Sequence, residues 1–134
     1  MTEPARLDRF EIIAFVPIPD ADRARSFYRD TLGLELVSDE PPFAVVFNAH
    51  GVMLRLSIDP EAKPSRGTVL GWKVPDIEAA VCDLVRAGVS FERYGFLKQS
   101  ESGIWDSPSG ARVGWFKDPD GNTLSITQFP AQQD

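Results

Sequence analysis

The sequence is poor in cysteine and histidine, the side chains that most often build structural metal sites. It contains one of each among 134 residues. The single cysteine, Cys82, cannot form a disulfide within the chain. A zinc site made of several Cys and His side chains is excluded for the same reason. We expect Cys82 to be a small, buried or half-buried apolar side chain. We expect His50, which falls in a turn, to be solvated.

Long apolar runs and a surplus of basic residues are also missing. No apolar run approaches the roughly 18 residues of a membrane-spanning helix, and the N-terminal residues lack the apolar centre of a signal peptide. Acidic residues outnumber basic residues by 20 to 14, for a net charge of −6, which disfavours contact with nucleic-acid backbones. We therefore expect a cytoplasmic protein that binds neither nucleic acid nor membrane.

What the chain does contain is typical of one globular domain. Apolar residues make up 43% of the sequence and charged residues 25%, which are ordinary values for such a domain. A chain of this length buries enough apolar surface to fold without disulfides or metals. We expect a single domain over residues 1–134.

The clearest local signal lies near the C-terminus, where residues 113–117 and 123–129 are predicted to be strands. The sequence DPDGN between them has the residues of a tight turn. In the second strand Leu124 and Ile126 point to one face, and Thr123, Ser125 and Thr127 to the other. One face is therefore expected to pack on a core, and the other to meet solvent or a cavity.

Two stretches of the sequence resemble a known family. The segment KDPDGNTLSITQF at residues 117–129 is similar to the closing hairpin of the vicinal oxygen chelate family, which includes glyoxalases, bleomycin-resistance proteins and extradiol dioxygenases. The segment VPIPDADRARSFYRDTLGLEL at residues 16–36 resembles the family's first helix. The resemblance implies an α+β fold in which two βαβββ modules form a curled mixed sheet, a half-barrel, around a central cleft. It also implies pairing into a homodimer.

The order of expected elements repeats once along the chain. Asp20 and Gly33 bracket a predicted helix at 21–32, and Asp76 and Gly88 bracket a second one. We expect module one at 9–58, a linker at 59–67 and module two at 68–129. The strands are expected at 10–16, which we expect to be covered on both faces, and at 34–37, 43–47, 52–58, 68–74, 89–94, 104–106, 111–117 and 123–129.

The metalloenzymes of this family bind a divalent cation with His and Glu side chains at four cleft positions. The resemblance places those positions at Ile13, Arg55, Val69 and Ser125. Isoleucine and valine have no lone pairs to donate, arginine is a cation, and serine is a weak neutral ligand. We therefore expect no metal and no cofactor.

The alternation of the strands predicts which side chains line the cleft. Arg55 is notable among them, because a buried cation needs an anionic partner. That partner is either Glu11 on a neighbouring strand or the carboxylate or phosphate of a ligand, unless Arg55 is simply exposed to solvent. Trp105 and Trp115 either fill a core or dimer interface, or offer a surface on which a ligand stacks. The predicted ligand-binding residues are Glu11, Ile13, Phe15, Met53, Arg55, Val69, Trp105, Trp115 and Ser125.

Three functions remain open. The sequence favours a metal-free protein that binds a small, largely apolar or aromatic, acidic molecule, as drug-sequestering resistance proteins do. The second is a lyase, isomerase or dioxygenase whose displaced metal site recruits Glu11, Glu40 or His50. The third is a metal-free enzyme with Glu11 as the base and Arg55 or Lys73 in support. Glu11 and Arg55 are thus the catalytic candidates, and whether the protein is an enzyme stays open.

Overall fold

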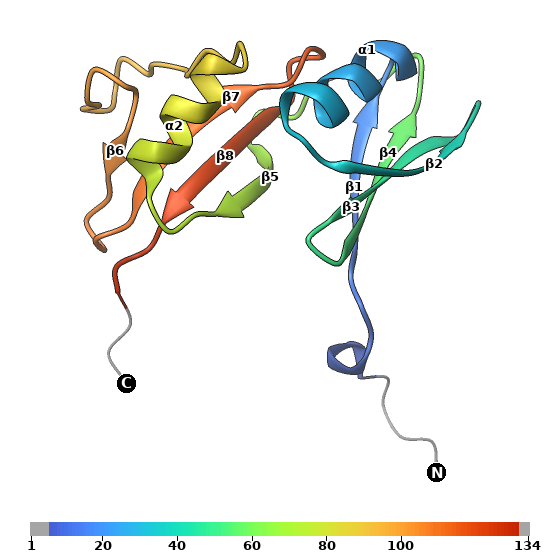
Figure 1. The fold of residues 1–134 in the computed structure, drawn as a ribbon, viewed down its shortest axis with the longest axis horizontal. Helices are drawn as coiled ribbons and strands as arrows, with labels where there is room; N and C mark the ends of the chain where they lie inside the picture. Colours follow the sequence, from blue (N-terminus) through green and yellow to red (C-terminus); the bar gives the residue numbers. More distant parts are fainter. Residues whose placement is uncertain (1–5, 132–134) are drawn as a thin grey trace.

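The computed structural model describes residues 6–131, which form two four-stranded sheets with a helix against each (Figure 1). Sheet A has the strand order β1-β4-β3-β2, and sheet B has the order β5-β8-β7-β6. The first module comprises η1 (Leu7–Arg9), β1 (Ile13–Ile18), α1 (Ala21–Ser26), the π-helical turn η2 (Phe27–Thr31), β2 (Glu35–Glu40), β3 (Ala44–Ala49) and β4 (Val52–Ile58). The second comprises β5 (Thr68–Lys73), α2 (Ile77–Arg86), β6 (Trp105–Asp106), β7 (Arg112–Lys117) and β8 (Thr123–Gln128).

Both sheets are mixed in the same way. The first strand of each module pairs in parallel with the last, β1 with β4 and β5 with β8, and the other neighbours are antiparallel. The expected α+β fold of two repeated modules is thereby confirmed. Within residues 6–131, no helix has the length and apolar character needed to cross a membrane.

Both helices begin directly after the aspartate that was predicted to cap them. The Asp20 carboxylate accepts a hydrogen bond from the backbone N–H of Arg23, and Asp76 accepts one from Ala79, each at 3.2 Å. These bonds satisfy N–H groups that lack a partner within the helix. After the first helix, η2 continues the coil to Thr31, so the predicted helix at 21–32 is present with a wider last turn.

One face of each sheet packs under a helix. In sheet A, Val16 of β1 and Leu56 of β4 are fully buried in one hydrophobic cluster with Tyr28, which follows α1. In sheet B, Phe116 and Leu124 are buried in the same cluster as Ile77 and Val81 of α2. We call the opposite face of each sheet, which points away from its helix, its open face.

The strand predicted at 10–16 differs from the observed one in position and in exposure. Strand β1 spans Ile13–Ile18 and includes Pro17, because β1 is an edge strand, where a missing N–H is tolerated. The prediction that both faces of this strand are covered is wrong. Phe15 is 58% exposed, whereas Val16 is fully buried.

The predicted strand at 89–94 is absent from the described chain, where Phe91 makes only an isolated bridge with Phe116. The segment forms loop contacts instead. Arg93 donates side-chain hydrogen bonds to the carbonyls of Ser100 and Glu101, and Gln99 bonds the backbone of Glu92 and Tyr94. Cys82 is also exposed, contrary to the expectation of burial.

The DPDGN turn joins the second module to the first. The Tyr28 hydroxyl donates a 2.8 Å hydrogen bond to Asp118 Oδ2, and Asn122 Nδ2 donates one of 3.1 Å to the Pro17 carbonyl. Arg23 forms an ion pair with Asp120. The backbone N–H groups of Asp120 and Asn122 bond the other Asp118 oxygen, each at 2.9 Å. A buried carboxylate therefore organises both the turn and the contact between modules.

Candidate functional site

The open face of sheet A carries four of the predicted ligand-binding residues. In the strand register Ile13 lies opposite Met53, and Phe15 lies opposite Arg55. Ile13, Phe15 and Met53 are 48%, 58% and 42% exposed. This face is therefore an apolar surface with one cation within it.

The counter-charge of Arg55 is Glu40 and not Glu11, which corrects the first alternative. Arg55 Nη2 lies 3.4 Å from Glu40 Oε1, and the Arg55 side chain is 27% exposed. Strand β2 continues to Glu40, past the predicted end at residue 37, and Val46 of β3 lies opposite Arg55. In this longer strand Ser38 lies opposite Val46, and Glu40, two residues further along the same strand, reaches Arg55 diagonally.

Glu40 is held as a carboxylate by two neighbours. The Ser38 hydroxyl donates a 2.7 Å hydrogen bond to it, and this bond lowers the pKa of Glu40. The positive charge of Arg55 lowers that pKa further. Glu40 is therefore an anion at neutral pH.

Glu11 does not lie in a strand. It precedes β1, is exposed, and borders a shallow hollow of about 340 Å³ together with Ile13 and Met53. The catalytic hypothesis placed Glu11 in an apolar cleft, where desolvation would have favoured proton uptake. That burial is not observed in the described chain.

The open face of sheet B carries an aromatic cluster. The ring centroids of Trp105 and Trp115 lie 5.9 Å apart at an interplanar angle of 34°, and Tyr94 contacts Trp115 edge-on at 5.6 Å. Phe96, 84% exposed, extends the cluster beyond Tyr94. Tyr94 and Phe96 were not among the predicted site residues, because Tyr94 was expected in a strand and Phe96 in a loop.

Ser125 and Val69 differ in how well they follow the predicted strand phase. Ser125 lies opposite Trp115, on the open face of sheet B, and is 8% exposed. Val69 lies at a register shift between Thr68 and Leu70 and packs in part against the hydrophobic core. The alternation that placed Val69 in the cleft is interrupted at this residue.

The predicted site residues thus form two groups on different sheets. Within residues 6–131, no hydrogen bond or ion pair joins the Arg55 group to the tryptophan group. Whether these residues bind a ligand stays a prediction.

The family resemblance assigned four positions to metal ligands, and the residues at these positions are not suited to bind a cation. Ile13 and Val69 offer no donor atoms, and Arg55 is a cation paired with Glu40. In the part of the chain that the structure describes, no three His, Cys, Asp or Glu side chains are grouped so as to hold a metal ion.

Two repeated modules, each a mixed four-stranded sheet with a capped helix on one face, define a glyoxalase-type α+β fold. The sequence profile of the Glyoxalase/Bleomycin resistance protein/Dioxygenase superfamily matches residues 6–126. The chain belongs to this superfamily.

Solved structures of the same fold support this assignment. A member of the superfamily from Sphaerobacter thermophilus DSM 20745 is 26% identical, with a TM-score of 0.69 over 89% of this chain and 96% of that one. Lactoylglutathione lyase from Agrobacterium tumefaciens is 21% identical, with a TM-score of 0.68 over 87% and 92%. TnmS3, an antibiotic binding protein from Streptomyces sp. CB03234, is 23% identical, with a TM-score of 0.66 over 90% and 98%. No curated protein gave a significant match.

Proposed function

We propose that this protein binds a small, largely apolar or aromatic acid on the open face of sheet A, without a metal. The observation that carries the proposal is the half-buried Arg55 guanidinium beside the exposed side chains of Phe15 and Met53. A cation within an apolar surface suits a ligand that has both an anionic group and an apolar body. The structural likeness to an antibiotic binding protein is consistent with this class of function.

The Arg55–Glu40 pair leaves room for a ligand carboxylate. Its 3.4 Å separation is longer than the roughly 2.7–2.9 Å of a strong charge-assisted bond. Glu40 is 47% exposed, so it can return to solvent at little cost. A ligand acid would then take its place on Arg55, with a bond that contributes about 1.5–3 kcal/mol.

Titration with 1-naphthoic acid tests the proposal through two charge-deleting variants. Arg55→Met keeps most of the side-chain volume and removes the cation, so affinity for the acid should fall at least about tenfold. Glu40→Gln removes the competing anion, so the acid should bind more tightly. Uncharged naphthalene should bind all three proteins alike. Isothermal calorimetry gives the three affinities.

Three results would contradict the proposal. Equal binding of the acid to wild type and Arg55→Met would make Arg55 a structural ion-pair partner. If Glu40→Gln lowers the affinity for 1-naphthoic acid as much as Arg55→Met does, the ion pair acts only by stabilising the sheet. Elemental analysis of the protein used in the titration should find no stoichiometric divalent metal, and one metal per chain after mild chelation would overturn the metal-free assignment.

A further inference from the structure

A second cavity lies between the two modules, on the helix side of sheet B. Its volume is about 650 Å³, within the range of roughly 300–1,000 Å³ that is typical of small-molecule sites. Neither Arg55 nor the Trp105–Trp115 pair lines it. Strand phase explains the separation from the tryptophan pair, because Trp72 pairs with Ile126 of the core face, whereas Trp115 pairs with Ser125 of the open face.

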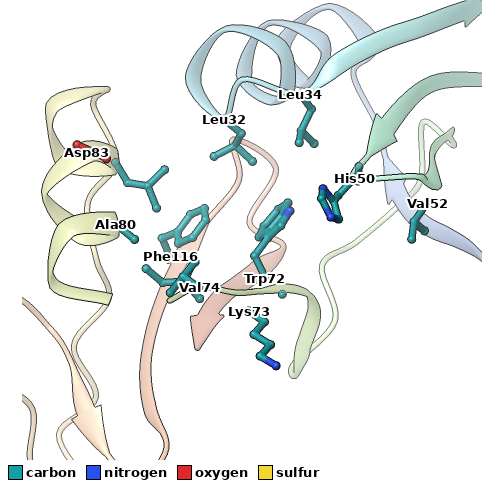
Figure 2. Close-up of a pocket in the computed structure, with 14 residues that line it drawn as sticks. Leu32, Leu34, His50, Val52, Trp72, Lys73, Val74, Ala80, Asp83 and Phe116 are labelled. Atoms are coloured by element: carbon teal, nitrogen blue, oxygen red, sulfur yellow. The ribbon is translucent and has the colours of Figure 1, made fainter. Parts of the chain in front are cut away.

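The walls of this inter-module cavity are apolar and come from both modules. Figure 2 shows the indole of Trp72 projecting from β5 into the space below Leu32 and Leu34, which follow the first helix. Phe116 of β7 and Leu84 of α2 line the opposite side. Because Leu32, Leu34, Trp72 and Leu84 are only partly buried, apolar surface remains for a ligand to cover.

His50 closes the cavity on the side of the first module, and the turn that carries it holds it in place. His50 has a φ of 52° and Gly51 a φ of 88°, as a two-residue turn between β3 and β4 requires. Asn48 Oδ1 accepts a 2.8 Å hydrogen bond from the Gly51 N–H and braces the turn. In Figure 2 the imidazole points from this turn toward Trp72.

The polar groups around the cavity suit an uncharged ligand. Lys73 and Asp83 border the cavity but are both exposed to solvent, and in Figure 2 the Lys73 ammonium points away from Trp72. Within residues 6–131, the imidazole of His50 and the indole N–H of Trp72 form no hydrogen bond with another side chain or with the backbone. Both groups are free to bond a ligand that carries a hydroxyl, amine or carbonyl group.

We infer that this inter-module cavity is a second binding site, which takes a neutral aromatic molecule between Trp72, Leu84 and His50. It goes beyond the acid-binding face proposed above, because it lies on the other side of the sheets and selects against charge. Stacking on Trp72 and contact with Leu32 and Leu84 supply the apolar part of the binding, and His50 with the Trp72 indole N–H supplies the polar part.

Of the three tryptophans of the chain, only Trp72 lines the cavity, so its emission can report on this site alone. In the double variant Trp105→Phe/Trp115→Phe, all indole emission comes from Trp72. The probe is N-phenyl-1-naphthylamine, an uncharged fluorescent aromatic amine. Its binding should quench Trp72 emission by energy transfer and saturate with a micromolar Kd. In the reciprocal variant Trp72→Phe, 1-naphthoic acid should still bind, and adding Arg55→Met should still lower its affinity as described above.

Two substitutions test the cavity itself in the double-variant background. Ala80→Phe, a change on α2, places a ring in the cavity and should lower the affinity for the probe at least tenfold. His50→Gly removes the imidazole, suits the positive φ of the turn, and should weaken the probe severalfold. Arg55→Met should leave the probe's affinity unchanged. If Ala80→Phe fails to fold, His50→Gly, which changes an exposed residue, decides the test.

The inference is overturned if saturating probe leaves Trp72 emission unchanged. It is equally overturned if His50→Gly binds the probe as tightly as its parent does, or if 1-naphthoic acid quenches Trp72 at lower concentration than the neutral probe. These results are distinct from failure of the acid-binding proposal, which is measured by Arg55→Met with the acid ligand.

Discussion

Tyr28 carries a hydroxyl group whose hydrogen bond crosses from one module to the other. Its ring is fully buried, and its only side-chain partner within residues 6–131 is Asp118, itself 4% exposed. Burial raises the pKa of Tyr28 well above its usual value, and the negative charge of Asp118 raises it further. The hydroxyl therefore stays protonated in the folded protein and remains a donor to the carboxylate.

Removal of that hydroxyl should lower stability. Tyr28→Phe leaves the buried Asp118 carboxylate without one of its donors, and we expect a loss of about 1–3 kcal/mol in the free energy of unfolding. Urea denaturation followed by circular dichroism measures it. Tyr94→Phe is the matched control, because the Tyr94 hydroxyl forms no hydrogen bond within the described residues. A loss in the control equal to that in Tyr28→Phe would refute the role of the Asp118 bond.

The same residue predicts how stability depends on alkaline pH. The unfolded chain releases the Tyr28 proton near pH 10, whereas the folded chain holds it. Tyr28 therefore makes its full contribution to the free energy of unfolding below pH 10. Above pH 10 this contribution declines by about 1.4 kcal/mol for each pH unit. Wild type should lose stability more steeply than Tyr28→Phe above pH 10. Parallel curves for the two proteins would contradict this.

At the scale of elements, β5 and β8 pack more closely than a side chain at Gly71 would allow. A Cβ atom at Gly71 would lie 2.6 Å from Ser125 Oγ, on the open face of sheet B. The close approach of Ser125, and not the backbone conformation, favours glycine at this position. The pairing of β5 with β8 thus depends on one small residue opposite another.

Gly71→Ala should therefore destabilise the protein by about 1 kcal/mol, at the low end of overpacking costs because Ser125 can rotate. Adding Ser125→Ala should restore most of the loss by removing Oγ. Gly67→Ala serves as the control, since a Cβ at Gly67 meets nothing within 4 Å. Thermal unfolding of the four proteins distinguishes these outcomes. If the double variant is no more stable than Gly71→Ala, the Oγ contact is not the cause.

At the scale of the whole molecule, much apolar surface faces outward. Phe10, Ile12, Val37 and Phe43 are all exposed by more than half, and strands β1, β2, β5 and β6 are sheet edges. Exposed apolar patches and open sheet edges are commonly covered by a partner. The expectation of a homodimer therefore stands as a prediction with a physical reason.

Light scattering at tens of micromolar protein should give twice the 14.8 kDa mass of the chain. Phe43→Lys changes an exposed side chain of the first module and should shift the protein toward monomer. Phe96→Lys, a comparable change on the loop before β6, is the control. A mass near that of one chain for wild type over this concentration range would refute the dimer.

The sequence alone determined the features that depend on neighbouring residues along the chain. Asp20 and Asp76 cap the helices as predicted, because a cap bonds a backbone N–H three residues away. The alternation along β4 also placed Met53 and Arg55 on one face, because side chains in a strand change sides at every residue. The two matches to known family segments gave the fold.

Only the tertiary structure decided which distant residues meet. The partner of Arg55 is Glu40 because β2 runs longer than its turn residues suggested and pairs through β3 with β4. The segment at 89–94 carries a strand-like pattern, but side chains of the following loop bond its backbone, so it forms no ladder. The space beside Trp72 exists because two modules pack without filling it. Such contacts depend on which segments lie side by side after folding, and residues that are neighbours in the sequence do not determine this.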